Sequence, residues 1–432
     1  MRILFLDQFS KKEIHSIQVH HLQTDKYKTN TIVVNIATDL IKENVTKVAL
    51  LPYILKRGSK KYPSLKQIQE KLDDLYGVTL DAYVFKRGER QIVQFSCEVA
   101  NEKYLNENRS LLKEAIDLLG NLITQPLIED QGFQSIIFET EKELLAQRIK
   151  SILDDKIQYA EQKMIENMCK NEPYRLPANG CLDDLAHITK DNLYQFYQEW
   201  MNTAPIDFFI VGDYDESIVH TAIAESFQLP KRQVKPLAEV IVDVPVKEEK
   251  IVVEALDVKQ GKLNLGLRTY TTIQDDDYIP MLLFNGVLGG FAHSKLFVNV
   301  REKASLAYYA SSKLDSHKGI MIIQSGIEIK NYDKAVEIIK QQVQMMKEGK
   351  ITEQEINQTK AILTNQLKEM LDRPRQLIDY TYHGVLSQKP RTLSQMIEQT
   401  KHVTIDDLIR VGQKVKLDTI YFLKDHVKED AN

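Results

Sequence analysis

The stretch that decides the fold lies in the second half of the chain, where residues 285–290 read NGVLGG, residues 294–297 read SKLF and residues 300–308 read VREKASLAY. The glycines of the first segment predict a turn between two helical patterns. Apolar residues recur at helical spacing through the next two segments, which predicts an amphipathic helix. Arg301 ends this helix, and Tyr308 begins the strand that follows.

One pattern of elements occurs in both halves of the chain. Residues 187–193 predict a helix start, and an apolar strand at 206–211 follows and ends in an acidic turn. Residues 403–408 predict a second helix start, and a strand at 419–423 follows in the same order. In both places a threonine precedes an acidic first turn, which is a common N-cap pattern. We therefore expect a duplication.

A second pair of matching segments lies upstream of the first. In the first half, a strand at 95–99 leads to an amphipathic helix at 101–119. In the second half, a strand at 319–327 leads to a helix at 332–346. The strands differ in length, which indicates an old duplication rather than a tandem array.

The two halves are separated by residues 230–250, which carry three prolines and alternating charges. Proline cannot continue a helix and restricts the residue before it, so this stretch is expected to be an extended linker. We therefore predict an N-terminal domain at 1–229 and a C-terminal domain at 251–432.

Each half mixes alternating strands with long helices. Residues 16–20 and 31–36 look like neighbouring strands, and residues 91–95 alternate apolar and polar side chains. Such alternation suits a sheet with one face on the core. A capping box from Thr352 to Glu355 opens a helix. Strands followed by helices within each half predict an α+β fold with mostly antiparallel sheets, rather than a wound parallel sheet.

Length, charge and cysteine content limit the class of protein. The chain has 432 residues, with 57 Lys and Arg against 61 Asp and Glu. This near-neutral balance argues against nucleic acid as a partner, because phosphate binding needs a concentrated basic surface. Cys97, Cys169 and Cys181 are an odd number without a C-x-x-C pair. We therefore expect neither a disulfide framework nor a thiolate zinc site.

The N-terminal apolar run at residues 1–6 is too short for the hydrophobic region of a signal peptide. No segment approaches the ~18 consecutive apolar residues of a membrane helix. We expect a soluble, cytoplasmic protein without a membrane span.

The histidines show no metal-binding arrangement. His20 and His21 are adjacent in a predicted strand and therefore face opposite sides. His187 follows Asp183 at a spacing that is more typical of a local hydrogen bond. The sequence contains no H-E-x-x-H, H-x-x-E-H or G-x-S-x-G motif and no P-loop.

The ordered string at 285–308 resembles the C-terminal half of the M16 peptidases, the family of insulinase, pitrilysin and the mitochondrial processing peptidase. In that family a glycine turn, an S-[RK]-L-F element and an R-E-K-x-x-L-A-Y element occur in this order. Residues 211–213, and residues 172–174 with Gly180 downstream, fit the same family. The resemblance spans nearly the whole chain and implies two duplicated domains that form half of a clamshell.

The resemblance also locates the family's zinc motif in this sequence. M16 enzymes carry H-x-x-E-H followed by K-G-[ST], in which the histidines bind zinc and the glutamate activates water. Here Arg57, at the start of an R-G-S triplet, marks the end of that motif. Ala49 and Tyr53 then stand at the histidine positions, and Pro52 stands at the glutamate position.

The third zinc ligand of the family follows an E-[RK] pair by seven residues on one helix. Glu141 begins the matching pair, so Arg148 stands at the ligand position, with Gln147 as the alternative if the alignment slips by one residue. A zinc hydrolase needs three protein ligands and an open position. The resemblance therefore implies no metal or other cofactor in this chain.

Arg301 and Tyr308 match the family. The resemblance implies that this pair points at the substrate bound near zinc. A tyrosine hydroxyl and a guanidinium can donate hydrogen bonds to the carbonyl oxygen on which peptide hydrolysis builds negative charge. The other interpretation is a surface arginine and a core tyrosine kept for packing.

In some small M16 proteins, one chain supplies zinc and the other supplies the Arg/Tyr pair. The resemblance therefore implies the non-catalytic, substrate-binding subunit of a heterodimeric M16B-type zinc metallopeptidase that processes small peptides. Its expected partners are a zinc-bearing M16 paralogue and an extended peptide held by pairing with an edge strand. Two alternatives stay open. One is a structural or binding protein of this fold with no role in proteolysis, and the other is a peptidase with an unusual metal site.

Overall fold

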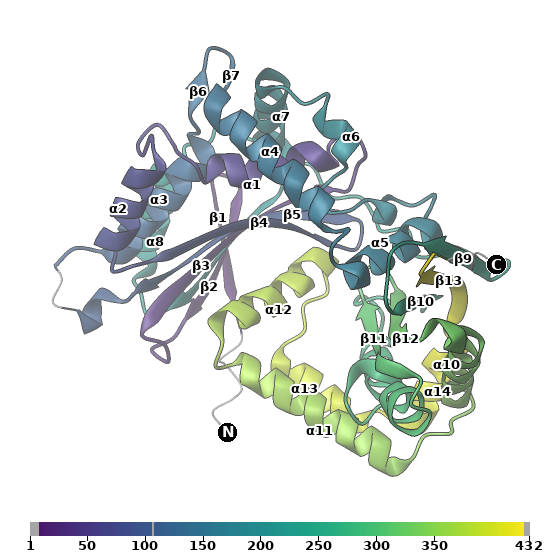
Figure 1. Cartoon of the computed structure of the whole chain (residues 1–432). Coiled ribbons are helices and arrows are strands. Elements are labelled where there is room, and N and C mark those ends of the chain that lie inside the picture. Colours follow the sequence, from purple (N-terminus) through teal and green to yellow (C-terminus); the bar gives the residue numbers. More distant parts are fainter. Residues whose placement is uncertain (1–7, 106–107, 427–432) are drawn as a thin grey trace. The chain divides into compact units, whose positions relative to one another are not determined.

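The computed structural model describes residues 8–105 and 108–426, which fall into two compact units (Figure 1). Unit 1 takes its described residues from Met1–Lys150, Leu176–Glu239 and Arg373–Tyr382, and unit 2 takes them from Ser151–Arg175, Val240–Asp372 and His383–Asn432. The chain crosses between the units more than once, and the crossing between Glu239 and Val240 lies within a stretch that contains neither helix nor strand. Among the described residues, no helix is long and apolar enough to cross a membrane.

A six-stranded sheet forms the centre of unit 1. In spatial order its strands are β1 (Ser10–Ile14), β2 (Ile17–Gln23), β8 (Ile206–Gly212), β3 (Thr29–Asp39), β5 (Arg90–Ala100) and β4 (Thr79–Arg87). All neighbours are antiparallel except β2 and β8, which are parallel. The prediction that residues 16–20 and 31–36 form neighbouring strands is wrong, because β8 lies between β2 and β3. Ser16 itself has a φ of 60° and lies in the turn between β1 and β2.

Helices cover one face of this sheet. The elements of unit 1 outside the main sheet are α1 (Val45–Leu55), α2 (Leu65–Asp74), η1 (Glu102–Tyr104), α3 (Leu111–Thr124), the β6–β7 hairpin (Ile128–Glu129 and Gly132–Phe133), α4 (Ser135–Ser151), α6 (Leu182–Leu185), α7 (Lys190–Thr203) and α8 (Glu216–Ser226). Alternate residues of β2, β3 and β8, such as Val19, Val34 and Phe208, are fully buried against this layer. Their period of two sets which face is the core.

The other face of the same sheet carries a row of polar side chains. Tyr83, Gln94, Asn35 and Asp207 lie opposite one another on four adjacent strands. Gln94 donates a hydrogen bond of 2.7 Å to Asn35 and accepts one from Arg375. The arginine belongs to α12 (Pro374–Ser387), whose first part is counted in unit 1. This row is therefore covered by a helix from late in the chain.

Unit 2 repeats the sheet of unit 1 without its first strand. In spatial order its strands are β11 (Ala307–Asp315), β12 (Ile320–Ile327), β10 (Gly261–Arg268), β13 (Lys416–Lys424) and β9 (Lys250–Ala255). The first three pairs are antiparallel and the last is parallel, as in the series β4, β5, β3, β8 and β2. The predicted duplication and the α+β fold are thereby confirmed.

The helices of unit 2 repeat those of unit 1 less closely. They are α5 (Lys156–Met168), η2 (Pro173–Arg175), α9 (Tyr278–Asn285), η3 (Gly286–Gly290), η4 (Phe297–Lys303), η5 (Ile329–Asn331), α10 (Tyr332–Lys347), α11 (Glu353–Met370), α13 (Leu393–His402) and α14 (Ile405–Lys414). Helices α7 and α14 both begin with a capping box, formed at Thr189 and Thr404. The predicted capping box between Thr352 and Glu355 opens α11. These caps satisfy backbone N–H groups that a helix start leaves unpaired.

Helix α5 lies on the face of the unit 2 sheet that corresponds to the polar face in unit 1. Gly266 of β10 permits this packing, because a Cβ atom there would lie 2.5 Å from the sulfur atoms of both Met164 and Met168. Tyr159 donates a hydrogen bond of 2.6 Å to Glu254 of β9. Each unit thus has helices on one face of its sheet and a single helix on the other.

Candidate functional site

Helix α1 carries Ala49, Pro52 and Tyr53, the three positions that the resemblance assigns to the zinc motif. Ala49 and Pro52 are buried where α1 packs on β4 and β5. Pro52 lies inside the helix and has no backbone N–H, so it cannot donate the usual hydrogen bond to the preceding turn. Tyr53 is partly exposed. Of these three positions, only the tyrosine presents a polar side chain.

Arg148 of α4 lies directly on the Tyr53 ring. The Cζ atom of its guanidinium is 3.7 Å from the ring centroid, which is a close cation–π contact. Burial raises the pKa of the Tyr53 phenol above its ordinary value, although the charge of Arg148 opposes this rise. The structure therefore brings together two of the four residues that sequence reasoning placed at the zinc positions.

Glu141 completes this cluster from the same helix as Arg148. Its side chain is only 2% exposed. Arg57 donates a hydrogen bond to its Oε1 atom through Nε, and Arg57 Nη2 forms an ion pair with the same oxygen. Arg148 Nη2 lies 3.6 Å from its Oε2 atom. Sequence reasoning used Glu141 and Arg57 only to align the motif and missed this contact, because no local pattern predicts an ion pair between a helix and a loop distant in sequence.

These residues do not fit a catalytic zinc ion. A methyl group, a proline ring and a guanidinium offer no lone pair to a metal, and one phenol cannot form a site alone. The positive charge of Arg148 also disfavours a cation beside Tyr53. In the part of the chain that the structure describes, no group of three His, Cys, Asp or Glu side chains is placed to hold a metal ion.

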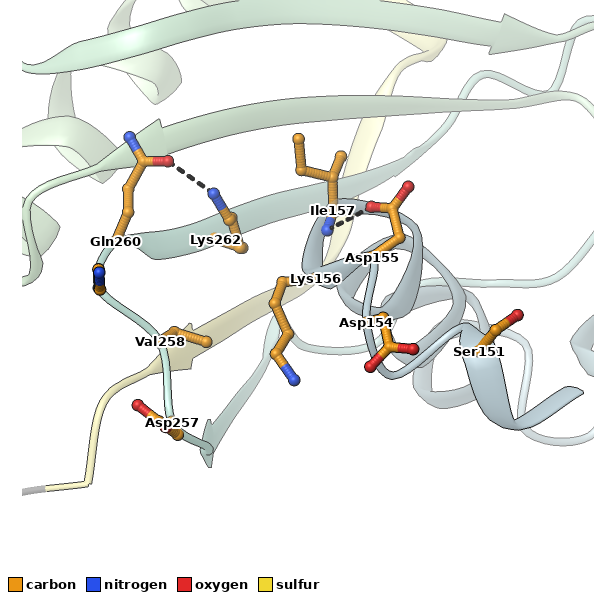
Figure 2. A pocket seen from close by; sticks show the side chains of 10 residues that line it. Ser151, Asp154, Asp155, Lys156, Ile157, Asp257, Val258, Gln260 and Lys262 are labelled. Carbon is orange, nitrogen blue, oxygen red and sulfur yellow. Dashed lines mark hydrogen bonds between the residues drawn. The ribbon is translucent and has the colours of Figure 1, made fainter. Parts of the chain in front are cut away.

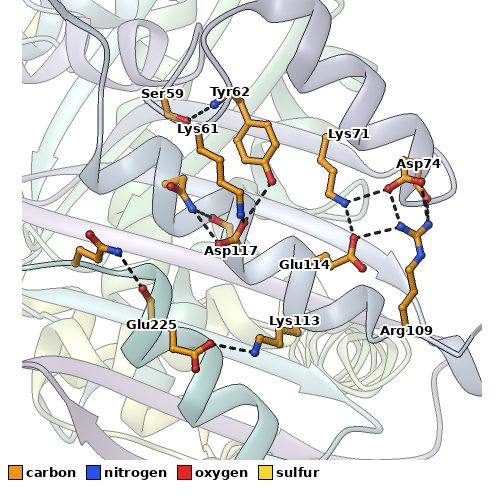
Figure 3. A network of polar contacts seen from close by, with 12 residues as sticks. Ser59, Lys61, Tyr62, Lys71, Asp74, Arg109, Lys113, Glu114, Asp117 and Glu225 are labelled. Carbon is orange, nitrogen blue, oxygen red and sulfur yellow. Dashed lines mark hydrogen bonds and ion pairs between the residues drawn. The ribbon is translucent and has the colours of Figure 1, made fainter.

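The loop after α1 is held by a polar network (Figure 3). Tyr62 N donates to Ser59 Oγ over 3.2 Å, and Lys61 pairs with Asp117 of α3. Burial raises the pKa of the Tyr62 phenol, and the nearby Asp117 carboxylate raises it further by a smaller amount. These contacts fix the loop that carries Arg57.

The segment that carries Arg301 is a π-helix, and so is the glycine segment before it. Gly286–Gly290 continues α9, so the predicted turn at 285–290 is wrong. The glycines serve close packing, because a Cβ atom on Gly289 would lie 2.6 Å from the Ser312 backbone nitrogen of β11. π-Helical turns are rare and occur often at functional sites.

Buried contacts hold this segment in place. Lys295 is 5% exposed and pairs with Glu355 of α11 over 2.8 Å. Ser312 donates a hydrogen bond of 2.7 Å to the side chain of Asn285. The residues around Arg301 and Tyr308 are therefore fixed by tertiary contacts on both sides.

Arg301 and Tyr308 themselves are exposed. The Arg301 guanidinium lies 4.5 Å from the Phe297 ring centroid, which leaves its edge toward solvent. Tyr308 is 67% exposed. The register between β11 and β12 shifts between Ala307 and Tyr309, so Tyr308 is the extra residue of a β-bulge on an edge strand. Bulges redirect a side chain and are common next to functional sites.

A pocket of about 680 Å³ opens in unit 2 close to this strand (Figure 2). Its lining includes Lys262 of β10, which lies opposite Gly326, the residue that pairs with Tyr309. The Lys262 ammonium is 5.8 Å from the Tyr309 ring centroid and donates a hydrogen bond of 2.6 Å to Gln260. Burial lowers the pKa of Lys262 and raises that of Tyr309 to about 12. Sequence reasoning gave no indication of this pocket.

Known proteins share this architecture. Residues 187–363 match the family described as "Peptidase M16 inactive domain". The chain is 42% identical to the "Probable inactive metalloprotease YmfF" of Bacillus subtilis (strain 168), over 96% of this chain and 97% of that protein.

Solved structures of other proteins share this fold. A conserved protein from Enterococcus faecalis V583 has a TM-score of 0.89 and 33% identity, covering 98% of this chain and 100% of that chain. A peptidase M16 inactive domain from Pseudomonas fluorescens has a TM-score of 0.80 and 16% identity, covering 97% and 98%.

The duplicated sheets and these relatives define the class of protein as an inactive metallopeptidase homologue. The chain belongs to the M16 peptidase family. Within that family it is a non-catalytic homologue.

Proposed function

We propose that the chain is the substrate-binding subunit of a two-chain M16B-type peptidase, in which a zinc-bearing paralogue carries the metal and small peptides are cleaved. The observation that carries this proposal is the placement of Tyr308. It is a large aromatic side chain, 67% exposed, in a bulge at an edge strand. A tyrosine retained only for packing would be expected to be buried.

Arg301 and Tyr308 can contribute donors without a metal of their own. A guanidinium and a phenol both donate hydrogen bonds, and each suits a carbonyl oxygen that gains negative charge during hydrolysis. The partner's zinc would supply the activated water. Since β11 is a sheet edge, an extended peptide could pair with its backbone beside Tyr308.

The test is co-expression with the zinc-bearing paralogue. Cleavage of a peptide library is measured for the pair, for the partner alone and for this chain alone. We expect the pair to cleave at least tenfold faster than the partner, and this chain alone to show no activity. If the partner alone is as fast as the pair, the proposal fails and a structural or binding role is favoured instead.

We further propose that the complex of this chain and its zinc-bearing partner works in the cytoplasm. The odd number of cysteines and the lack of a C-x-x-C pair support a reducing compartment. Fractionation of cells that express a tagged chain tests this location, and a tagged chain recovered outside the cytoplasmic fraction would contradict it.

A further inference from the structure

Within the described part of the chain, the outer edge of β9 in unit 2 has no strand beside it. In unit 1 the corresponding strand, β2, is covered at this edge by β1. Leu256 N donates a hydrogen bond of 3.0 Å to Lys424 O of β13, just beyond the end of β9. Because successive residues of a strand direct their backbone groups to opposite sides, those of Ile251 and Val253 point away from β13. Their N–H and C=O groups therefore face the open edge.

The open edge is apolar on one face of the sheet. Ile251 is 62% exposed and Val253 is 51% exposed, and they lie beside the buried Ile420 and Phe422 of β13. The outermost strand of unit 1, β1, instead carries exposed Lys and Glu side chains at residues 11–13. Charged side chains on an edge strand oppose pairing with another chain, whereas an exposed apolar edge favours it. The edge of β9 thus lacks the protection that unit 1 has.

The sequence of β9 is complementary to a second copy of itself. In an antiparallel pairing with Val252 at a two-fold axis, Ile251 faces Val253 of the second copy. In the same pairing Lys250 faces Glu254 of the second copy. Cross-strand pairs of β-branched side chains and of opposite charges both stabilise a sheet. The open backbone groups of Ile251 and Val253 would also bond to each other across the axis.

Other positions of the axis bring like charges together. Moving it back by one residue from Val252 places Glu248 opposite Glu254. Moving it forward by one residue places Glu249 opposite Asp257. Like charges directly opposite each other are destabilising, so charge selects the register centred on Val252.

The carboxylate of Glu254 is already held in place. It accepts hydrogen bonds of 2.6 Å from Tyr159 and 2.7 Å from Tyr421, one on each oxygen. A carboxylate has about four acceptor positions, so both oxygens can still accept from a lysine. Lys250 is exposed and can meet this carboxylate on the second copy.

We propose that two copies of the chain associate through their β9 strands, which pair antiparallel about a two-fold axis at Val252 and join the two unit 2 sheets. A two-fold contact is closed, so it covers both open edges and ends at a dimer. Strand β11 is the opposite edge of the same sheet, so the edge proposed for peptide stays free. The association needs neither peptide nor zinc and goes beyond the proposed function.

Sedimentation velocity of the full chain measures the association over roughly 1–200 µM. A single pair of strands buries less area than a standard interface, so we expect a weak dimer with a Kd of about 10–100 µM. Ile251→Lys places a charge at the apolar edge and should raise this Kd about tenfold or more. Ile136→Lys is the matched control, because Ile136 is 72% exposed on α4 of unit 1. Its Kd should stay within about twofold of the wild-type value.

Single cysteines test the register. At a non-hydrogen-bonded antiparallel pair the Cα atoms lie about 4.5 Å apart, which a disulfide can span. Val252→Cys should therefore form a disulfide-linked dimer in oxidised glutathione. In Lys250→Cys the two cysteines would be separated by four residues of extended strand, about 13 Å. This variant is the control, and it should form no more linked dimer than the wild type, although its position is more exposed.

Thermal unfolding checks that each variant is folded at the assay temperature. If Ile251→Lys lowers the thermal midpoint, Lys250→Glu replaces it, because a glutamate there would face Glu254 of the second copy and should also raise the Kd. A chain that stays monomeric throughout, or one that forms species larger than a dimer, would overturn the proposal. So would a dimer that neither variant weakens, or equal cross-linking of Val252→Cys and Lys250→Cys.

Discussion

At the scale of single residues, the exposed pair in unit 2 is held by buried neighbours. Val300 is fully buried one position before Arg301, and Leu306 is 6% exposed two positions before Tyr308. The two functional candidates can therefore be changed without opening the core. This separation makes it possible to test their contribution to the reaction apart from stability.

Replacing Arg301 by Ala and Tyr308 by Phe should slow the pair of chains and leave its assembly intact. We expect cleavage to fall by at least roughly 10²–10³-fold, because removing even one transition-state donor typically costs that much. The measurement is kcat/KM of the co-expressed pair, with the thermal midpoint as the fold control. Lys303→Ala, also exposed in the same segment, should keep the rate. Loss of assembly in the double variant would instead favour the packing interpretation.

A buried ion-pair network in unit 2 makes one residue sensitive to pH. Burial alone would raise the pKa of Glu172, but hydrogen bonds from Arg268 and Lys318 outweigh it and hold the pKa below the ordinary value. The Lys318 ammonium lies 2.7 Å from Glu172, and Arg268 also pairs with Asp418 over 2.8 Å. The folded state thus keeps the Glu172 carboxylate charged to lower pH than the unfolded state does.

Glu172→Gln should therefore destabilise the protein, with a defined pH dependence. Removing one partner of a buried ion pair costs roughly 3–5 kcal/mol. The contribution is complete above the unfolded pKa of about 4.3, and it is lost as the pH falls through the lower folded value. Urea unfolding at pH 7 and near pH 3 should show the gap between wild type and variant closing in acid. Glu398→Gln, at a 59% exposed position, should change stability little at either pH. A gap that is the same at both pH values would contradict this assignment.

At the scale of elements, the packing of α5 on β10 depends on a missing side chain. Gly266→Ala would place a Cβ atom against the sulfur atoms of Met164 and Met168. Overpacking of this kind costs typically 1–3 kcal/mol, and flexible methionines keep the cost near the lower end. Urea unfolding should therefore show a loss of about 1 kcal/mol. In a Met164→Ala background the same change should cost less, because the clash is relieved. An equal cost in both backgrounds would show that the contact is not the cause.

The elements that the sequence predicted correctly are those with local patterns. Capping threonines such as Thr352 and alternating strands such as β5 depend on neighbours in the chain, so their position could be inferred. The insertion of β8 between β2 and β3 could not be predicted, because it depends on pairing between strands that are distant in sequence. The turn predicted from the glycines at 285–290 was wrong for another reason. A glycine can serve a turn or a close approach, and only the contact with Ser312 shows which applies.

The candidate site shows the same difference between features set by local sequence and features set by contacts between distant segments. The positions Ala49, Pro52, Tyr53 and Arg148 were found by matching the family's zinc motif. Such a match shows only that the expected zinc ligands and glutamate are replaced. The stack of Arg148 on Tyr53 joins α4 to α1, and no sequence pattern predicts a side-chain contact between these two helices. The exposure of Tyr308 likewise depends on a bulge that one-residue register shifts create.

At the scale of the whole molecule, the proposed division of labour predicts a metal stoichiometry. The described residues of this chain offer no group of three metal-ligating side chains, and Arg148 places a positive charge beside Tyr53. Purified alone after zinc-supplemented expression, the chain should carry close to zero zinc per molecule. The co-purified pair should carry about one zinc per two chains, since a catalytic site with three protein ligands would belong to the partner.

Elemental analysis of each sample, normalised to chain concentration, measures this ratio. A His-to-Ala change at a zinc ligand of the partner is the control, and it should remove the zinc without dissociating the pair. Adding a chelator should then abolish cleavage by the pair and leave the thermal unfolding of this chain alone unchanged, because metal loss destabilises only a protein that binds the metal. One zinc bound per molecule of the isolated chain would contradict the division of labour and favour a peptidase with an unusual metal site.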